Sequence, residues 1–194
     1  MSKSLECEER VMLSIIQYKN LLKEFANSKP FTLVNEYYDD PKLTLINNHK
    51  MLRVRNLNRK GFELTLKIKG KSGDLEINEK INYNQHYKLK NSIGFPKGEI
   101  KEILKDTLPL ENIRYITKLK TIRYERPIDN YLLVLDKNFY NGFVDYDLEV
   151  EAKTKEKALK IIKKYCTKYN IDYSPKYKGK SRRAVYSVIN EVDL

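Results

Sequence analysis

The sequence predicts an α+β fold in which a closed antiparallel β-barrel surrounds a charged interior and helices pack on its outside. Three observations lead to this prediction. At least four segments alternate charged and apolar residues, so that each forms a strand with one charged and one apolar face. The charged faces are acidic on some strands and cationic on others. Two longer segments carry apolar residues at helical spacing and can cover apolar sheet faces.

A barrel with a wet interior is the arrangement that accommodates both faces of these strands. If the apolar faces pack under the helices, the charged faces cannot lie in an ordinary core, because burying an unpaired charge costs several kcal/mol per ion. In a closed barrel the charged faces line a hydrated interior instead. The acidic and cationic rows are therefore expected to face one cavity.

The composition indicates an anionic partner. The chain has 194 residues, of which 41% are hydrophobic and 33% charged, with a net charge of +12 at pH 7. This length suits a single domain over residues 1–194, and the positive excess favours a phosphorylated or otherwise acidic partner. Cys7 and Cys166 are expected to be reduced and buried. No segment has the composition of a membrane span or a signal peptide, which predicts a cytoplasmic protein.

Strands are predicted from alternation and β-propensity, and the turns between them from Asp, Asn, Gly and Pro. The acidic turn before Pro41 and the Asn141-Gly142 pair are the clearest turn signals. In chain order the predicted strands cover residues 5–12, 31–38, 43–46, 51–56, 62–69, 75–81, 112–127, 131–137 and 145–151.

Helices are predicted where apolar residues recur every three or four positions. Ser14 and Gln17 form a capping-box pattern ahead of the first helix, Pro30 lies beyond its end, and Thr154 can cap a later one. The predicted helices cover residues 15–27, 85–92, 99–106, 155–169 and 182–190.

The strand over residues 145–151 carries the strongest charge pattern. Asp145, Asp147, Glu149 and Glu151 share one face, and alternate residues of a strand lie roughly 6.6 Å apart. Glu6, Glu8 and Arg10 form a similar face on the strand over residues 5–12. Taken alone, either strand could be the solvated outer strand of an antiparallel sheet.

The cationic faces belong to other strands. Arg53 and Arg55 share a face, and Lys67 and Arg123 lie on the charged faces of their own strands. A cavity lined by both signs suits a polyanion that is bridged to metal ions. Lys and Arg would bind phosphate oxygens, and the carboxylates would hold Mg²⁺ or Mn²⁺, which prefer oxygen ligands.

The ordered set of motifs resembles the CYTH family, also called the triphosphate tunnel metalloenzymes. The family's Glu-x-Glu-x-Lys hallmark is matched by residues 6–10, with Arg10 in place of the lysine. The further matches, in family order, are Arg53-Val54-Arg55, Leu64-Thr65-Leu66-Lys67, Glu76, Arg123, Asp136, Glu149-Val150-Glu151, Lys180 and Arg183. They span residues 6–183, which is nearly the whole chain.

The resemblance implies an eight-stranded antiparallel tunnel that binds triphosphate groups with Mg²⁺ or Mn²⁺. It implies a hydrolase acting on inorganic triphosphate, a nucleoside triphosphate such as ATP, or thiamine triphosphate. Cyclisation of ATP and non-catalytic binding of polyphosphate or nucleotides stay open as alternatives, and a homodimer is compatible with either. A nucleic-acid-binding module is less favoured, because no RNA- or DNA-binding signature is present.

The resemblance also implies residue roles. The expected metal ligands are Glu6, Glu8, Glu76, Asp136, Glu149 and Glu151. The expected phosphate-binding residues are Arg10, Arg53, Arg55, Lys67, Arg123, Lys180 and Arg183. Glu8 and Arg10 are the catalytic candidates. The alternative for every one of these side chains is a structural ion pair inside the barrel.

Three further expectations concern single residues. Arg10 stays protonated and cannot act as a base, so any mechanism that needs a neutral amine there would fail. Asp145 and Asp147 share the acidic face but are weaker metal candidates, because they lie near the start of the strand. His49 and His86 have no partner spacing and are expected to be ordinary surface histidines.

Overall fold

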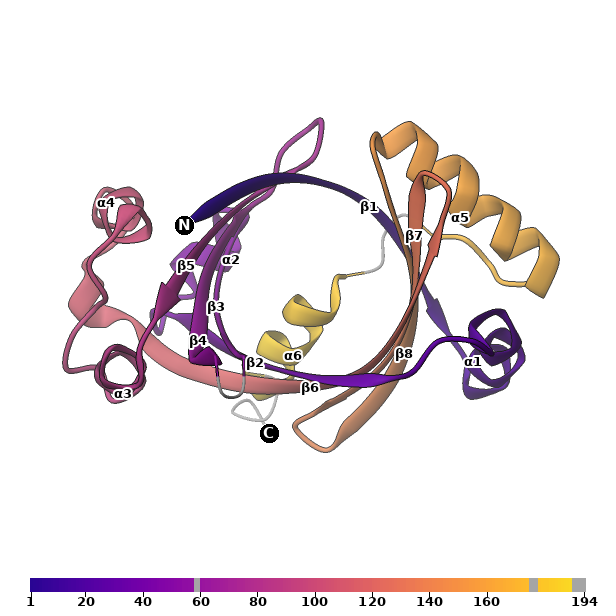
Figure 1. Ribbon diagram of the computed structural model, residues 1–194. Helices are drawn as coiled ribbons and strands as arrows, with labels where there is room; N and C mark the ends of the chain where they lie inside the picture. Colours follow the sequence, from indigo (N-terminus) through magenta and orange to yellow (C-terminus); the bar gives the residue numbers. More distant parts are fainter. Residues whose placement is uncertain (58–59, 175–177, 190–194) are drawn as a thin grey trace.

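The structure is a computed structural model that describes residues 1–57, 60–174 and 178–189. Antiparallel strands close into a barrel in the order β1-β5-β4-β3-β2-β6-β7-β8 (Figure 1). The strands are β1 (Ser2–Leu13), β2 (Phe31–Asp39), β3 (Lys50–Asn56), β4 (Phe62–Ile68), β5 (Asp74–Ile81), β6 (Arg114–Ile128), β7 (Tyr131–Tyr140) and β8 (Phe143–Ala152). The predicted closed eight-stranded antiparallel barrel is confirmed.

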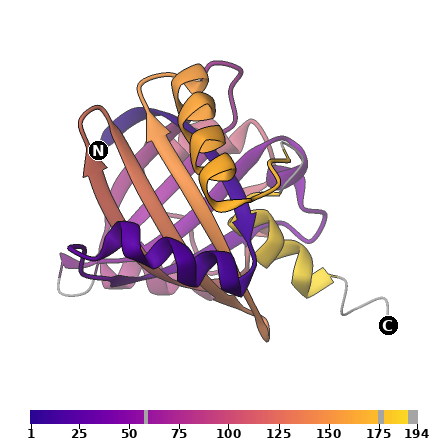
Figure 2. The same ribbon diagram turned by 90° about the vertical axis from the view of Figure 1, so that its right-hand side faces the viewer.

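Two helices cover the outer face of β1, β7 and β8. They are α1 (Ile15–Leu21) and α5 (Lys155–Tyr169), and Figure 2 shows α5 lying along the strands. The outward-facing Val11, Leu148 and Val150 pack with Ala158 and Ile162 of α5 in one buried cluster. Inward and outward residues alternate along each strand, so this cluster fixes which face of β8 is left to line the interior.

The opposite side of the barrel is covered in the same way. Here α3 (Tyr83–Lys90) and α4 (Glu99–Lys105) lie against β3, β4 and β5 (Figure 1). Leu64 and Leu66 of β4 are fully buried in a second cluster with Leu89, Ile100 and Leu104. A short 3₁₀ helix, η3 (Leu110–Asn112), precedes β6.

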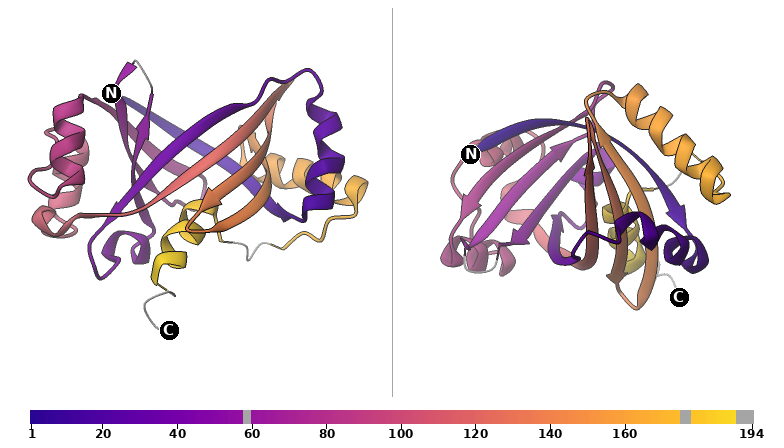
Figure 3. Two further views of the ribbon diagram at one scale, coloured as in Figure 1. Left: turned by 90° about the horizontal axis from the view of Figure 1, so that it is seen from below. Right: turned by 45° about the vertical axis from the view of Figure 1, so that its right-hand side comes forward.

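The last described helix, α6 (Lys180–Ile189), lies at one end of the barrel. Viewed along the barrel it falls inside the outline of the ring, and from below it lies in front of the strands (Figures 1 and 3). Its buried Ala184 and Val185 pack against Tyr37, Leu119 and Tyr140. This end of the interior is thereby covered by a helix that also carries cationic side chains.

One predicted element is wrong. The segment expected as a strand over residues 43–46 is the short helix α2 (Thr44–Asn47). The carboxylates of Asp39 and Asp40 accept hydrogen bonds from the backbone N–H groups of residues 44, 45 and 46, at 2.7, 2.9 and 3.0 Å. These side chains satisfy the first N–H groups of a helix, which outweighs the β-propensity of the segment.

Helix boundaries differ from the predictions for identifiable reasons. The first helix ends at Leu21 and continues as a 3₁₀ turn, η1 (Leu22–Phe25). The helix expected from residue 85 begins at Tyr83, because Asn82 and Gln85 form a capping box that was not recognised in the sequence.

Cys7 and Cys166 are both buried and free, as predicted. Among the described residues, no helix is long and apolar enough to cross a membrane.

Candidate functional site

The barrel interior holds a cavity of about 680 Å³ that is lined by both rows of charge. The predicted site residues that line it are Glu6, Glu8, Arg10, Arg53, Arg55, Lys67, Glu76, Arg123, Glu149, Glu151 and Lys180. Asp136 and Arg183 lie just behind this lining and form hydrogen bonds with the inner faces of β6 and β8. Side chains from distant parts of the chain therefore meet in one place, as the alternation predicted.

Three carboxylates form a group that could hold a metal ion. One oxygen from each of Glu8, Glu149 and Glu151 lies within 4.8 Å of the other two. The register of β1 and β8 creates this group, because it places Glu8 opposite Glu151 and Arg10 opposite Glu149. An all-oxygen donor set suits Mg²⁺ or Mn²⁺, so these residues fit the predicted ion.

Two other predicted ligands, Glu6 and Glu76, lie around Lys67 rather than in this group. The Lys67 ammonium donates to Glu6 and Glu8 at 2.9 Å each and is 3.7 Å from Glu76. Lys67 thus connects the carboxylates of β1 with those of β5. Burial disfavours its charge, but the surrounding carboxylates outweigh this and raise the pKa of Lys67, which keeps the ammonium charged.

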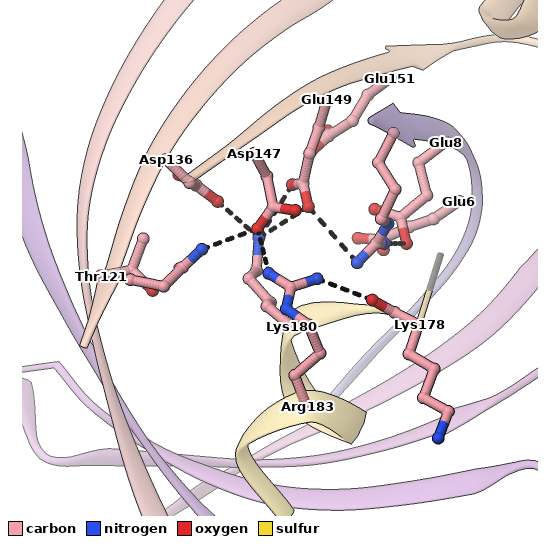
Figure 4. Close-up of polar contacts among 12 residues, drawn as sticks. Glu6, Glu8, Thr121, Asp136, Asp147, Glu149, Glu151, Lys178, Lys180 and Arg183 are labelled. Carbon is pink, nitrogen blue, oxygen red and sulfur yellow. Dashed lines mark hydrogen bonds and ion pairs between the residues drawn. The ribbon is translucent and has the colours of Figure 1, made fainter. Parts of the chain in front are cut away.

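Asp136 is fully buried and its oxygens are occupied by cations. Arg123 donates to both Asp136 oxygens, at 2.9 and 2.7 Å. Lys180 donates to Asp136 at 2.5 Å, as Figure 4 shows. This bidentate pair holds the Arg123 guanidinium against the inner face of β8, where it also donates to Glu149. In this arrangement Asp136 orients cations and does not face the three-carboxylate group.

Glu149 is the most heavily neutralised carboxylate of the site. Lys180 donates to both of its oxygens at 2.9 Å, Arg123 donates at 3.0 Å, and Arg10 forms an ion pair at 3.4 Å. Burial alone would raise the pKa of Glu149, but these three cations hold it well below its usual value. The surrounding cations therefore favour the ionised form of Glu149.

The two other members of the group differ in electrostatic environment. Burial raises the pKa of Glu8, but Arg10 and Lys67 outweigh that effect and lower it to about 2. Burial raises the pKa of Glu151 to about 7, because Arg123 offsets it only partly and Glu149 and Glu8 repel its charge. A divalent cation between these residues would relieve that repulsion.

Arg10 lies between the members of the group. It is hydrogen-bonded to Glu8 and paired with Glu149, and these carboxylates raise its pKa above that of a free guanidinium although burial acts in the opposite direction. The neighbouring carboxylates thus favour the protonated form of Arg10, which agrees with the expectation that it is not a base.

Arg53 and Arg55, on the cationic side of the cavity, have fewer carboxylate partners than the cations described above. Arg55 donates from Nε to Asn35 at 3.0 Å, and among the described residues no carboxylate forms an ion pair with it. Burial, Arg53 and Arg123 lower the pKa of Arg55 to about 10. Arg53 lies 3.4 Å from Glu76, and its buried Nε has no hydrogen-bond partner. An anion entering here would satisfy donors that the protein leaves open.

Arg183 holds α6 against β8. It donates to Asp145 at 2.7 and 2.9 Å. It also donates to Asp147 at 2.6 Å and to the carbonyl of Lys178 at 2.7 Å (Figure 4). Asp145 and Asp147 are therefore partners of Arg183 and do not join the three-carboxylate group. Few donors of Arg183 remain for a phosphate.

Sequence reasoning missed the amide that supports this contact. Asn138 donates to Asp145 at 3.0 Å and to Asp147 at 2.7 Å, and accepts from Thr121 at 2.8 Å. The predicted strand ended at residue 137, whereas β7 continues to Tyr140. Extending the alternation from Asp136 would have placed Asn138 on the inner face.

One histidine prediction is also wrong. His86 is not an ordinary surface residue, because its Nε2 contacts Glu36 at 2.7 Å and its ring stacks on Phe62 with centroids 4.1 Å apart. The contact forms outside the barrel, between α3 and β2. It could not be predicted from spacing, since the partners are 50 residues apart in sequence. His49 is exposed, as expected.

A closed antiparallel barrel with carboxylates and cations facing one cavity defines a class of tunnel proteins suited to phosphorylated ligands. The chain belongs to the CYTH domain family, whose match covers residues 4–180.

Individual relatives agree with this assignment. The chain is 29% identical over 181 residues to a Bacillus subtilis (strain 168) protein named "Putative triphosphatase YjbK", covering 88% of this chain and 90% of that protein. It also matches the structure of a Bacillus halodurans protein described as a "putative adenylate cyclase", with a TM-score of 0.83 and 26% identity over 94% of this chain and 98% of that one.

A more distant structure shares the fold. The Hippeastrum protein "Putative adenylyl cyclase HpAC1" matches with a TM-score of 0.71 and 18% identity, covering 98% of this chain and 97% of that one. The barrel architecture is therefore common to bacterial and plant proteins.

Proposed function

We propose that the protein is a metal-dependent hydrolase of triphosphate-containing substrates. One observation carries the proposal: the carboxylates of Glu8, Glu149 and Glu151 converge to within 4.8 Å in the same cavity that Arg53 and Arg55 line. This is the charge distribution that a metal–triphosphate complex requires. The relationship to the Bacillus subtilis protein supports the proposed reaction.

The proposed metal ligands are Glu8, Glu149 and Glu151, with Glu6 and Glu76 beside them around Lys67. A bound Mg²⁺ or Mn²⁺ would neutralise phosphate charge and polarise a water molecule. Glu8, whose pKa is about 2, stays ionised and can accept a hydrogen bond from that water. Arg10 holds Glu8 and Glu149 in place and keeps their charges compensated.

The proposed phosphate-binding residues are Arg53, Arg55, Lys67 and Arg123. Their positive charges would stabilise the charge that spreads over the phosphoryl oxygens in the transition state, which is most of what phosphoryl transfer needs. In the substrate-free arrangement Lys180 and Arg183 hold carboxylates of the barrel. Lys180 binds Asp136 and Glu149, and Arg183 binds Asp145 and Asp147.

The proposed substrates are inorganic triphosphate, ATP and thiamine triphosphate. A second candidate reaction is the cyclisation of ATP, which the description of the Bacillus halodurans relative favours. In both reactions the same residues would bind the triphosphate group, but the products differ. Hydrolysis releases phosphate, and cyclisation releases pyrophosphate and cyclic AMP. A cytoplasmic location and a homodimer remain predictions.

The test is product release from tripolyphosphate, ATP and thiamine triphosphate, with Mg²⁺ and with Mn²⁺. We expect phosphate release that a chelator abolishes, and a loss of at least about a hundredfold in Glu149→Ala and Arg55→Ala. The matched control is Lys118→Ala, whose side chain is exposed on β6 outside the cavity. If both site variants retained wild-type hydrolysis at saturating Mn²⁺, the assignment would be wrong.

A further inference from the structure

A second cavity, of about 270 Å³, lies on the outside of the barrel between α3 and the strands β2, β3 and β4 (Figure 1). Alternation along the strands separates it from the interior. On β2, Asn35 lines the interior cavity and Glu36 the outer one, and on β3, Arg55 and Val54 divide in the same way. Among the described residues, none lines both cavities. We term this second cavity the outer pocket, and the proposed reaction makes no use of it.

Aromatic rings form much of the wall of the outer pocket. Phe62 stacks on His86 with ring centroids 4.1 Å apart, and the Tyr83 ring centroid lies 6.4 Å from that of Phe62. Tyr83 and Tyr87 lie one turn apart on the same face of α3 and are 73% and 50% exposed. Aromatic side chains that are left this open can stack on a flat ligand.

The outer pocket also contains a carboxylate among apolar neighbours. The side chain of Glu36 is 14% exposed, and Val34 and Val54 line the pocket beside it. The Nε2 atom of His86 contacts Glu36 at 2.7 Å, and Lys90 donates to it at 2.5 Å. These polar groups converge from β2 and α3 on one point of the pocket.

Glu36 is held in its ionised form. Burial would raise the pKa of Glu36, but its hydrogen bonds, above all those from Lys90 and His86, lower it below the usual value. An ionised carboxylate only accepts, so His86 is the donor in its contact with Glu36. A largely buried ion pair seldom stabilises a fold more than apolar side chains would. Polar groups that converge in an otherwise apolar pocket are instead typical of a ligand site.

The polar groups define the edge that a ligand must present. Glu36 accepts hydrogen bonds from Tyr38, His86 and Lys90, whereas a carboxylate can accept about four. Lys90 has three donors and uses one of them on Glu36. An acceptor and a donor of opposite charge therefore lie side by side. The volume is just below the roughly 300–1,000 Å³ of sites for drug-sized ligands, so a ligand of one or two rings suits it.

We propose that the outer pocket binds a small, uncharged nitrogen heterocycle with an amino group beside a ring nitrogen, as in the aminopurines and aminopyrimidines. The amino group donates to Glu36, the ring nitrogen accepts from Lys90, and the ring stacks on the exposed tyrosines of α3. This inference does not rest on the proposed function, because the outer pocket is separated from the interior cavity by the barrel wall.

The test is an NMR titration of the isotope-labelled full chain with 9-methyladenine, followed through the backbone N–H signals. The matched ligand is 9-methylpurine, which lacks only the amino group. We expect 9-methyladenine to shift signals of α3 and of β2 around Glu36. We expect it to bind at least about tenfold more tightly than 9-methylpurine, as one hydrogen bond to a charged group implies.

Two variants test the contacts with the ligand. Tyr83→Ala removes an exposed ring and should weaken the binding of both ligands at least about fivefold. The matched control is Phe143→Ala, which removes an exposed ring at the start of β8 and should leave both affinities within about twofold of wild type. Glu36→Met should abolish the preference for 9-methyladenine. The comparison of the two ligands on the wild type needs no substitution, so the test stands even if Glu36→Met does not fold.

Four outcomes would overturn the inference. The first is equal affinity of the wild type for the two ligands, and the second is an equal loss of binding in Tyr83→Ala and Phe143→Ala. The third is tighter binding of benzamidine, a cationic ring, which would assign the pocket to a cation such as an arginine side chain of a partner. The fourth is competition by tripolyphosphate, which would place the ligand inside the barrel. None of these measurements involves hydrolysis, so failure of the proposed function and failure of this inference are distinguishable.

Discussion

Arg55 and Arg123 lie on the same cavity wall but differ in their partners. Arg123 donates to Asp136 and Glu149, whereas Arg55 donates only to the amide oxygen of Asn35 among the bonds described. The pKa of Arg55 is lowered to about 10 by burial and by the neighbouring Arg53 and Arg123. The donors of Arg55 are therefore left for a ligand, whereas Arg123 also pairs with carboxylates of the protein, a common trade-off between stability and function.

This difference predicts opposite effects of two similar substitutions. Arg55→Gln should weaken tripolyphosphate binding at least about tenfold without lowering the free energy of unfolding by more than about 0.5 kcal/mol, because it relieves repulsion between cations. Arg123→Gln should lower the free energy of unfolding by about 3 kcal/mol, because it leaves Asp136 and Glu149 short of a buried partner. Urea unfolding and calorimetry measure both. A large destabilisation by Arg55→Gln would show that the protein does compensate this cation.

At the scale of elements, α6 is joined to the barrel by charge as well as by packing. Arg183 binds Asp145 and Asp147 of β8, and Lys180 binds Asp136 and Glu149. Both cations were predicted from the family resemblance to bind phosphate. Their observed partners could not be predicted, because they depend on where α6 lies relative to the end of the barrel.

Removing the Arg183 contact should loosen α6. Arg183→Met leaves the fully buried Asp147 without its cation, and we expect a loss of about 3 kcal/mol in the free energy of unfolding together with faster hydrogen exchange in α6. Adding Asp147→Asn removes the unpaired charge and should restore at least about half of the loss. If the second substitution gave no recovery, Arg183 would stabilise α6 by packing alone.

A second contact between elements predicts a dependence on pH. Glu24 of η1 accepts hydrogen bonds from Lys168 at 2.6 Å, from Tyr169 and from Arg126 at 2.8 Å, which lowers the pKa of Glu24 to about 2. A lowered folded-state pKa stabilises the protein above the unfolded value of 4.5, and this contribution is lost as the pH falls toward 2.

Glu24→Gln should therefore be fully destabilising only where Glu24 is ionised in both the folded and the unfolded state, and less so between the two pKa values. After allowance for solvent screening we expect a loss of about 1 kcal/mol in the free energy of unfolding near neutral pH, which shrinks as the pH falls below 4.5. Denaturant titrations of both proteins across this range measure the difference. A difference that does not change with pH would mean that the charge of Glu24 contributes nothing.

At the scale of the whole molecule, alternation in the sequence was sufficient to predict the charged interior. The inner faces of β1, β3, β4 and β8 were each identified from local pattern, because a strand exposes every second residue to the same side. The number of strands came from the family resemblance. The segment over residues 43–46 was misassigned, because two preceding carboxylates rather than its own propensity decide its conformation.

Contacts between distant parts of the chain could not be predicted from the sequence. The meeting of Glu8 with Glu149 and Glu151 follows from the register of β1 and β8, which no local pattern contains. Asn138 was missed only because its predicted strand ended at residue 137, before the end of β7 at Tyr140.

The central claim is that metal-binding carboxylates and phosphate-binding cations face one shared cavity, so that each ligand promotes binding of the other. The most direct measurement is calorimetric titration of Mn²⁺ into the protein with and without a non-hydrolysable triphosphate analogue. We expect the analogue to tighten Mn²⁺ binding at least about tenfold, and Glu151→Gln and Arg55→Gln each to weaken this coupling. Mn²⁺ binding of equal strength with and without the analogue would contradict the claim.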